Sequence, residues 1–326
     1  MRALAMRSPE AVLTPQERRA FRRRLLSWFD GNRRQLPWRS DRDPYHIWIS
    51  EIMLQQTRVA VVRDRYPGFL ARFPTLERLA AAKLPEVLAA WSGLGYYRRV
   101  RALHAAARQL VKGGAGFPRT AEDLAALPGI GRYTAAAIAS IAFDQPCAVV
   151  DGNVERVLGR LFGVQKQQAW RVAAELLHPR RPGDFNQAMM ELGATVCLPK
   201  TPLCEACPAF AWCRTRGPGV PRTPSLRRKK PVAYRLAVRH RSVFLVQREN
   251  HNSLMPGMWE LPQTWPAAGA PVLRLRHAIT NTDYQVSVYR ARTVNGMAGR
   301  WVKLAEVERL PLTGLTQKIL RRAQII

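Results

Sequence analysis

The stretch LPGIGRYTAAAIASIAF, residues 127–143, places two glycines two positions apart in front of a run of small and apolar residues. Gly129 and Gly131 can adopt backbone angles that are closed to other residues, so PGIG predicts a sharp turn. The run after it predicts a helix, whose first amides are free and whose dipole has its positive end at the turn. We therefore predict a hairpin at 127–132 that can bind an anion. A plain helix–helix turn with a glycine cap is the alternative.

Helix signals surround this hairpin on both sides. Thr14 to Glu17 form a capping box with Pro15 in the first turn, and Phe21, Leu25 and Phe29 follow at four-residue spacing. Further helix starts are predicted at 43–44 and at 120–123. The helical period continues to about residue 195, which predicts an all-helical domain over residues 1–214.

The pattern changes after this domain. Residues 215–231, TRGPGVPRTPSLRRKKP, combine proline, glycine and a basic run without an apolar period, so we expect a linker. Beyond it the period becomes two: Tyr284, Val286 and Val288 alternate in TDYQVSVYR, and RSVFLVQR is a second strand run. Residues 312–323 are typical of a closing helix. These patterns predict an α+β domain over 232–326.

The net charge of the chain restricts its partners. Among 326 residues, 52 Lys and Arg against 23 Asp and Glu give a formal charge of +29, which attracts polyanions, and nucleic acid is the first candidate. An anionic membrane surface is the less favoured alternative, because the arginines are spread over several helices and no apolar run is long enough to span a bilayer. Residues 1–15 lack the apolar core of a secretory signal, so we expect an intracellular, cytoplasmic protein with reduced thiols.

Four of the five cysteines lie within seventeen residues, in the spacing C-x6-C-x2-C-x5-C. Clustered thiols in a reduced compartment are more often metal ligands than disulfides. Zinc and a [4Fe-4S] cluster both accept four thiolates, but zinc sites usually contain two short cysteine pairs and this run has one. The spacing therefore favours the iron–sulfur cluster, in a loop over 197–213. The expected ligands are Cys197, Cys204, Cys207 and Cys213.

Two carboxylates stand in unusual surroundings. Glu51 has Ile47, Trp48 and Leu54 as helix neighbours, and burial among apolar side chains raises the pKa of a carboxyl group. Asp151 follows an apolar run at a helix start, where an N-cap is the simpler explanation. One protonated and one ionised acid is the pair that glycosidic bond cleavage requires, because the leaving group needs a proton while the sugar becomes cationic.

Several of these motifs together resemble the helix-hairpin-helix DNA glycosylases that carry an iron–sulfur cluster, and among them the MutY-type adenine DNA glycosylases. The resemblance covers about residues 15–323 and rests on WISEIMLQQTRV, GLGYYRRVRALH, LPGIGRYTAAAI, VVDGNVERVLGR and the four-cysteine run. It implies a helical domain of two lobes, a C-terminal domain similar to Nudix hydrolases, and hydrolysis of the bond that holds adenine in duplex DNA. The implied partner is DNA in which adenine is mispaired with 8-oxoguanine or guanine, bound by a monomer.

The resemblance also implies roles for individual residues. Glu51 would protonate the flipped-out adenine, and Asp151 would stabilise the cationic sugar with help from Asn153 and Tyr133. Gln56 would fill the vacated stack, and Leu94 and Tyr96 would wedge beside the opposite base. Taken without the family, a solvated helix position for Gln56 and core packing for Leu94 and Tyr96 are the simpler explanations.

Tyr133 distinguishes two branches of this superfamily. In the related endonuclease III-like enzymes a lysine occupies this position and attacks the sugar as an amine, which a phenol cannot do. The sequence GRYTA therefore predicts base removal by water without an efficient lyase step. A bifunctional endonuclease III-like glycosylase and a non-enzymatic iron–sulfur DNA-binding protein are the alternative hypotheses.

The C-terminal domain departs from its relatives at the loop that reads 8-oxoguanine. The family usually has Phe-Ser-His there, and this chain has Ile279, Thr280 and Asn281. The hydroxyl group and a hydrogen-bonding side chain are kept, but the aromatic ring is lost. We expect this loop to contact the base opposite the adenine.

Overall fold

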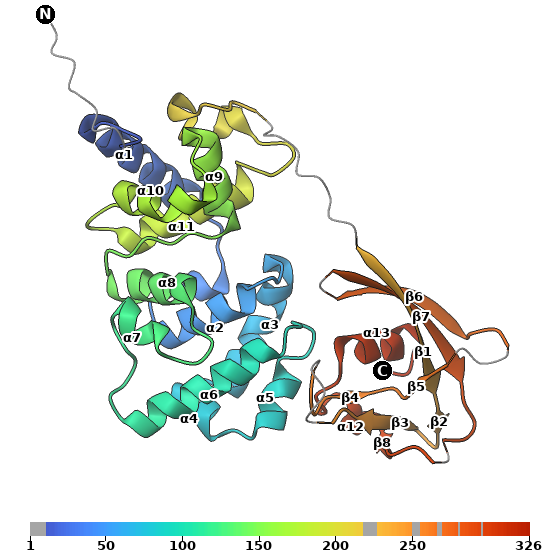
Figure 1. Ribbon diagram of the computed structural model, residues 1–326. Coiled ribbons are helices and arrows are strands. Elements are labelled where there is room, and N and C mark those ends of the chain that lie inside the picture. Colours follow the sequence, from blue (N-terminus) through green and yellow to red (C-terminus); the bar gives the residue numbers. More distant parts are fainter. Residues whose placement is uncertain (1–10, 218–226, 250–254, 266–268, 280, 295) are drawn as a thin grey trace, which may run out of the picture. The chain divides into compact units, whose positions relative to one another are not determined.

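The computed structural model describes residues 11–217, 227–249, 255–265, 269–279, 281–294 and 296–326. The chain forms two compact units, of which one comprises Met1–Pro67 and Gln109–Arg222 and the other comprises Gly68–Arg108 and Thr223–Ile326. Figure 1 shows the elements in chain order, and each unit is described separately.

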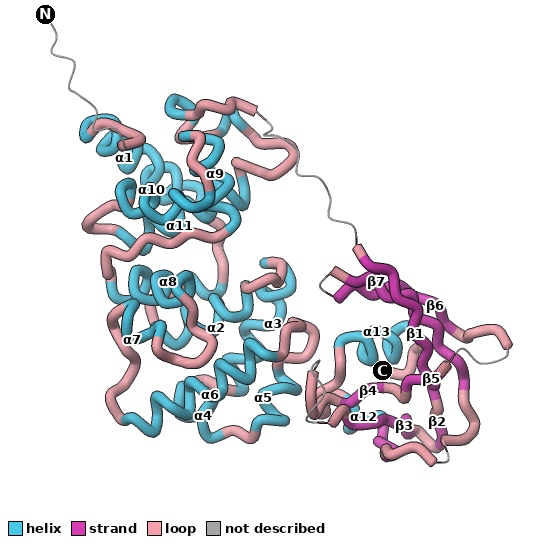
Figure 2. Tube along the Cα trace, viewed as in Figure 1, coloured by secondary structure: helices cyan, strands magenta, loops and turns pink. Residues whose placement is uncertain are grey.

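The first unit is helical. It differs from the helical domain expected over residues 1–214, because Gly68–Arg108 belong to the second unit. Its principal elements are α1 (Pro15–Asn32), η1 (Pro37–Arg39), α2 (Pro44–Leu54), most of α3 (Val59–Arg72), α7 (Ala121–Ala125), α8 (Arg132–Phe143), α9 (Gly152–Phe162), α10 (Ala169–Leu176) and α11 (Pro182–Thr195). Short turns follow at η2 (Lys166–Gln168), η3 (Cys204–Ala206) and η4 (Phe210–Trp212). Figure 2 shows that helix predominates in this part of the chain.

The helix starts expected from the sequence are confirmed. At α1 the Thr14 hydroxyl accepts from the amide of Glu17 while the Glu17 carboxylate accepts from the amide of Thr14, which satisfies two amides that the helix leaves unpaired. Asp43 caps α2 by accepting from the amide of Tyr45, and Thr120 caps α7 in the same way.

The core of the first unit forms where α1 packs with α9, α10 and α11. Phe21 is fully buried, and its ring meets the rings of Phe162, Phe185 and Trp212 edge to face, with centroids 5.4–6.2 Å apart. Each fully buried aromatic or aliphatic side chain contributes roughly 1.5–3 kcal/mol. This core holds α9 and α11 in position, and both helices contribute to the candidate site.

The second unit contains α4 (Leu76–Ala81), α5 (Leu84–Ala90), most of α6 (Arg98–Gly113) and the C-terminal domain. One sheet of that domain has the strand order β5-β1-β7-β6 and comprises β5 (Gln263–Thr264), β1 (Arg228–Leu236), β7 (Thr282–Arg290) and β6 (Leu273–Ile279). The other comprises β2 (Val238–Arg239), β3 (Ser242–Gln247), β4 (Trp259–Glu260) and β8 (Arg300–Lys303). The helices α12 (Leu304–Val307) and α13 (Gly314–Arg322) follow.

The strand and helix predictions for this domain are confirmed, and so is the fold class, a helical domain followed by an α+β domain. RSVFLVQR contains β3, TDYQVSVYR is β7, and residues 312–323 contain α13. Val286 and Val288 are buried in the core of the domain, and Tyr284 packs against that core.

The structure differs from the expected organisation at the basic run. Strand β1 begins at Arg228, inside the stretch 215–231 that the sequence analysis expects to be a linker. Arg228 to Pro231 pair in parallel with residues 282–285 of β7, so their backbone groups have partners even though their side chains are exposed.

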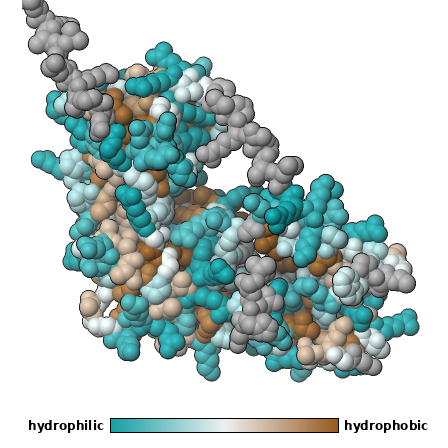
Figure 3. Space-filling view, viewed as in Figure 1, coloured by the Kyte–Doolittle hydropathy of each residue, from teal (hydrophilic) through white to brown (hydrophobic). Residues whose placement is uncertain are grey.

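Hydrophilic side chains cover much of the described surface in the view of Figure 3, with smaller apolar areas between them. Among the residues that the structure describes, no helix combines the length and the apolar character needed to cross a membrane.

Candidate active site

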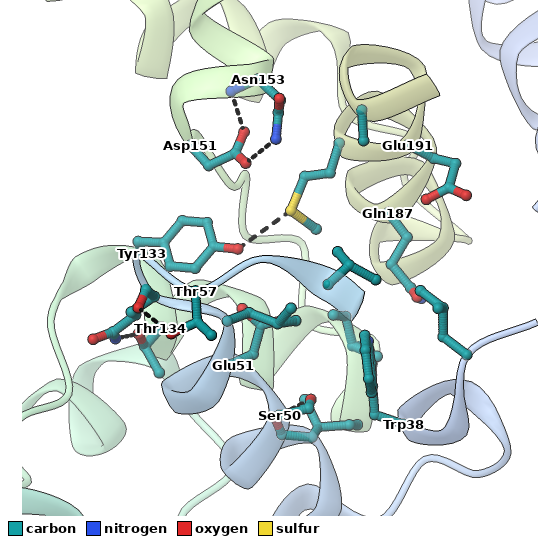
Figure 4. Close-up of a pocket in the computed structure, with 18 of the residues that line it drawn as sticks. Trp38, Ser50, Glu51, Thr57, Tyr133, Thr134, Asp151, Asn153, Gln187 and Glu191 are labelled. Atoms are coloured by element: carbon teal, nitrogen blue, oxygen red, sulfur yellow. Dashed lines mark hydrogen bonds between the residues drawn. The ribbon is translucent and has the colours of Figure 1, made fainter. Parts of the chain in front are cut away.

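A pocket of about 650 Å³ opens in the first unit, within the size range of ligand sites. Its wall is formed by α2, the start of α8, the start of α9, α11 and the segment 34–39. Figure 4 shows side chains from these elements pointing toward one another across it. Three of the predicted catalytic residues, Glu51, Tyr133 and Asp151, line this pocket, and so does the fourth, Asn153.

Glu51 lies on α2 with 6% of its surface exposed. The pKa of its carboxyl group is raised to about 7, chiefly by burial. The charge of Asp151 also raises it, while the interaction with the Tyr133 hydroxyl and the charge of Arg39 lower it. Its Oε2 atom is buried and is without a hydrogen-bond partner. A carboxyl group with this pKa carries a proton in about half of the molecules at neutral pH and can act as a general acid.

Tyr133 is the second residue of α8, directly after the glycine hairpin. Its hydroxyl donates to the Met190 sulfur at 3.3 Å and also interacts with the Glu51 carboxyl group. Burial is the largest cause of the raised pKa of Tyr133, and the charges of Glu51 and Asp151 raise it further. The phenol therefore stays protonated at neutral pH and is available as a donor.

Asp151 caps α9. Its Oδ1 accepts from the amides of Asn153 and Val154 at 2.9 and 2.8 Å, and its Oδ2 accepts from the Asn153 side chain at 2.8 Å. The N-cap role and the candidate catalytic role are thus compatible, because the hydrogen bonds that cap the helix also hold the carboxyl group in place at the pocket wall.

Glu191 is a pocket residue that sequence reasoning missed. It lies on α11 with 1% of its side chain exposed, and its two oxygens accept from Arg34 at 2.7 and 2.8 Å and from Arg39 at 2.9 Å. These hydrogen bonds and charges outweigh burial and lower the pKa of Glu191 to about 2. The pattern that identified Glu51, an acid among apolar helix residues, also occurs around Glu191, in AMMELGA at residues 188–194, and could have identified Glu191.

The hairpin has the backbone that the sequence predicts. Gly129 has a φ of +76°, which favours glycine, and Gly131 is the N-cap of α8. A Cβ atom added to Gly131 would meet nothing within 4 Å, and Gly131 lines the pocket, so the space beside this residue is open. This geometry permits an anion to approach the helix end.

Two of the three residues expected to insert into the DNA stack share a feature of the backbone. Gln56 lies exposed at the pocket and Tyr96 is 44% exposed in the second unit, and both have a positive φ, +55° and +47°. A bulky residue with this backbone is uncommon and strained. Leu94, by contrast, is 4% exposed and packs in the interior, as the simpler explanation predicts.

The reading loop is described in part. Ile279 ends β6 opposite Thr282 of β7, and the exposed Asn281 accepts at its carbonyl from the amide of Arg228. Thr280 lies outside the described residues. The described residues therefore form the end of the β6–β7 hairpin.

The four clustered cysteines line a single small cavity next to α9. The Cys213 sulfur accepts from the amide of Arg216 at 3.4 Å, and Arg160 lies 3.4 Å from the Cys197 sulfur. Within the described residues, no three His, Cys, Asp or Glu side chains stand close enough to hold a single metal ion. A [4Fe-4S] cube distributes its four thiolates over four irons, and four half-buried thiols around one cavity with N–H donors beside them suit that ligand set.

Comparison with known proteins gives results that agree with this geometry. The family model of the HhH-GPD superfamily base excision DNA repair protein matches residues 49–182. The human adenine DNA glycosylase is 53% identical over 215 residues, which are 60% of this chain and 39% of that protein. The adenine DNA glycosylase of Buchnera aphidicola subsp. Schizaphis graminum is 39% identical over 204 residues, with 59% and 58% covered. This chain thus spans about two fifths of the length of the human relative.

A solved structure extends the comparison. The structure of a thermostable thymine-DNA glycosylase is 31% identical, with a TM-score of 0.58, and the match covers 62% of this chain and 97% of that one.

The hairpin before α8 and the pocket between α2, α8, α9 and α11 define a protein of the helix-hairpin-helix glycosylase fold. The chain belongs to the HhH-GPD superfamily of base excision DNA repair proteins. Its resemblance to the MutY-type adenine DNA glycosylases, expected from the motifs, is confirmed by the curated relatives.

Proposed function

We propose that this protein is a monofunctional DNA glycosylase that removes adenine mispaired with 8-oxoguanine or guanine from duplex DNA. The observation that carries the proposal is the pair of pocket carboxyl groups with different environments, one buried and with a raised pKa, the other held by three donors. The similarity to adenine DNA glycosylases supports adenine as the base.

Glu51 is proposed to deliver the proton. An adenine extruded into the pocket would present its ring nitrogens to the buried carboxyl group, whose Oε2 is without a partner. Protonation turns the base into a better leaving group while the glycosidic bond breaks. Extrusion costs a few kcal/mol and costs least at a mispair, which favours the mispaired base.

Asp151 is proposed to stabilise the sugar. As adenine leaves, the sugar acquires oxocarbenium character, and a carboxylate held in place by Asn153 and by the start of α9 offers a fixed negative charge. Water then adds to the sugar. Because Tyr133 stands where a lyase would need a lysine, no Schiff base forms and the DNA strand stays intact.

Two further parts of the proposal concern DNA binding and the cofactor. The strained Gln56 and Tyr96 would insert into the stack, and the hairpin at Gly129 and Gly131 would bind a backbone phosphate. The [4Fe-4S] cluster would be held by Cys197, Cys204, Cys207 and Cys213, where it would supply a structural cross-link that shapes the loop.

The test uses end-labelled duplexes with one adenine opposite 8-oxoguanine or guanine, quenched either at neutral pH or with hot alkali. Breaks at the adenine that appear only after alkali are expected, and the ratio between the two duplexes reports how far the reading loop prefers the lesion. Glu51→Gln should lower the excision rate by about 10²–10⁴-fold, the usual contribution of a general acid. Glu122→Gln, an exposed change of equal charge on α7, should leave the rate unchanged.

The wild-type rate should fall as the pH rises through about 7, because Glu51 then loses its proton. Breaks without alkali, together with a covalent adduct trapped by borohydride, would favour the bifunctional alternative. Full activity of Glu51→Gln would contradict the proposal.

A further inference from the structure

We propose that the outer face of the sheet β5-β1-β7-β6 is a second DNA-binding surface, which holds the phosphate backbone independently of the pocket and the hairpin. The inference deepens the proposed function, since it assigns DNA contacts to a part of the chain outside the pocket.

The two faces of this sheet follow from the strand pairing. Val286 and Val288 of β7 point into the core, where Leu315, Ile319 and Leu320 of α13 pack in the same cluster. Figure 1 shows α13 on that side of the sheet. Because side chains alternate along a strand, the neighbours of these valines point to the opposite side. The outer face therefore consists of these residues: Thr264 of β5; Lys229, Pro231, Ala233 and Arg235 of β1; Asp283, Gln285, Ser287 and Tyr289 of β7; Arg274, Arg276 and Ala278 of β6.

The burial pattern supports this assignment. Along β6 the even-numbered Arg274, Arg276 and Ala278 are exposed, while Leu273 and Leu275, which alternate with the arginines, pack against the core. Arg274 pairs with Ser287 and Arg276 pairs with Gln285, so the two arginines stand beside the polar side chains of β7.

The face is predominantly positive. It carries Lys229, Arg235, Arg274 and Arg276, and among the described residues of its four strands Asp283 is the one acid. Asp283 is already paired with Arg227 at 2.8 Å. The cations of the face thus meet no uncompensated carboxylate within these strands, and their charge is available to an anionic partner.

The chemistry of the face suits a nucleic-acid backbone. Arg274 and Arg276 lie about 7 Å apart along the strand, and their long side chains can reach separate phosphates of a DNA strand. Serine, glutamine and tyrosine hydroxyl or amide groups, as in Ser287, Gln285 and Tyr289, also donate to phosphate oxygens.

The experiment measures binding of a fluorescent, undamaged duplex of mixed sequence at several salt concentrations. Arg274→Gln with Arg276→Gln should reduce the slope of log affinity against log salt by about 2, since each lost phosphate contact removes about 0.9. The affinity lost between 50 and 200 mM salt should then be about tenfold smaller than in the wild type.

The matched control is Lys303→Gln with Arg309→Gln, which removes two exposed cations of the same domain from outside this face. The control should keep the wild-type slope, and Arg274→Lys with Arg276→Lys should keep it as well, because both variants leave the charge of the face intact. Equal slopes in all variants, or equal reductions in the two glutamine doubles, would overturn the inference.

Adenine excision is measured separately on the mispaired duplexes. A protein that binds undamaged DNA through this face but removes no adenine would refute the proposed function and leave the inference standing. Normal adenine excision together with an unchanged salt slope in the Arg274→Gln, Arg276→Gln variant would overturn the inference and leave the proposed function standing.

Discussion

Glu51 and Glu191 are two buried glutamates in the wall of one pocket, and their surroundings move their pKa values in opposite directions. Glu51 has a raised pKa of about 7 because burial dominates. Glu191 has a lowered pKa of about 2 because two arginines donate to both of its oxygens. Two residues of one type on helices α2 and α11 thus acquire different pKa values through their surroundings.

The two glutamates should respond oppositely to replacement by glutamine. Above pH 7 the Glu51 carboxyl group loses its proton, and its charge is less stable in the folded protein than in the unfolded chain. Glutamine carries no charge, so Glu51→Gln should stabilise the folded protein above pH 7 by up to about 3 kcal/mol. This gain should vanish below the usual pKa of a glutamate, where Glu51 is protonated in both the folded and the unfolded protein. The stability that Glu191 contributes is present above that usual value and lost as the pH falls toward 2, so Glu191→Gln should cost about 3 kcal/mol at pH 7.

Urea unfolding at pH 8 and at pH 5 measures both effects. Two variants that destabilise equally at pH 8 would show that the pocket does not separate the two carboxyl groups.

At the scale of elements, the approach of α11 to α9 positions the candidate sugar-stabilising group. A Cβ atom added to Gly193 of α11 would lie 2.5 Å from the Asn153 Cβ atom, and Asn153 in turn holds Asp151. Arg156 of α9 also donates to the Gly193 carbonyl at 2.7 Å and to the Asn153 side chain at 2.8 Å. The glycine is therefore required by the close approach of the two helices.

Gly193→Ala should destabilise the protein and lower the excision rate, because either α11 or Asn153 must move. Such overpacking typically costs 1–3 kcal/mol. Gly68→Ala in α3 is the matched control, since its added Cβ meets nothing within 4 Å. It should stabilise the protein by up to about 1 kcal/mol through helix propensity. Thermal unfolding and single-turnover excision test the pair, and a harmless Gly193→Ala would contradict the packing argument.

At the scale of the whole molecule, the net charge of +29 favours binding of a polyanion, such as the DNA of the proposed function. Basic side chains occur in both compact units, as in the arginines of α1 and the outer face of the β5-β1-β7-β6 sheet. Contacts with phosphates release counterions, so the affinity depends on salt much more steeply than that of a neutral partner.

We expect the affinity for duplex DNA to fall about 10³–10⁵-fold between 50 and 200 mM salt, the range for a protein that contacts six to ten phosphates. Fluorescence anisotropy with an undamaged duplex measures this dependence, and a duplex that contains the mispair serves as the reference. An affinity that is insensitive to salt would contradict the prediction that the basic side chains contact DNA phosphates.

Much of the helical fold could be predicted because its signals are local. The capping box at Thr14, the glycine hairpin at 127–132 and the period-two pattern of β7 each depend on residues within a few positions, and the structure confirms them. The start of β1 at Arg228 was missed because a basic run with a proline has no strand pattern of its own. Its pairing with β7, more than fifty residues later, makes it a strand.

The sequence by itself determined the residue types of the site: an acid in an apolar helix, an aspartate at a helix start, a tyrosine after the hairpin and four clustered cysteines. Only the tertiary structure decided the pKa values and the ion pairs of the carboxyl groups in the pocket. The pKa of Glu51 depends on burial in the folded chain, and the ion pairs of Glu191 join residues 157 and 152 positions apart. The positive face of the sheet likewise exists because β1, β6 and β7 pair in one register. Burial and charge depend on which surfaces meet in the folded chain, and no local pattern specifies that.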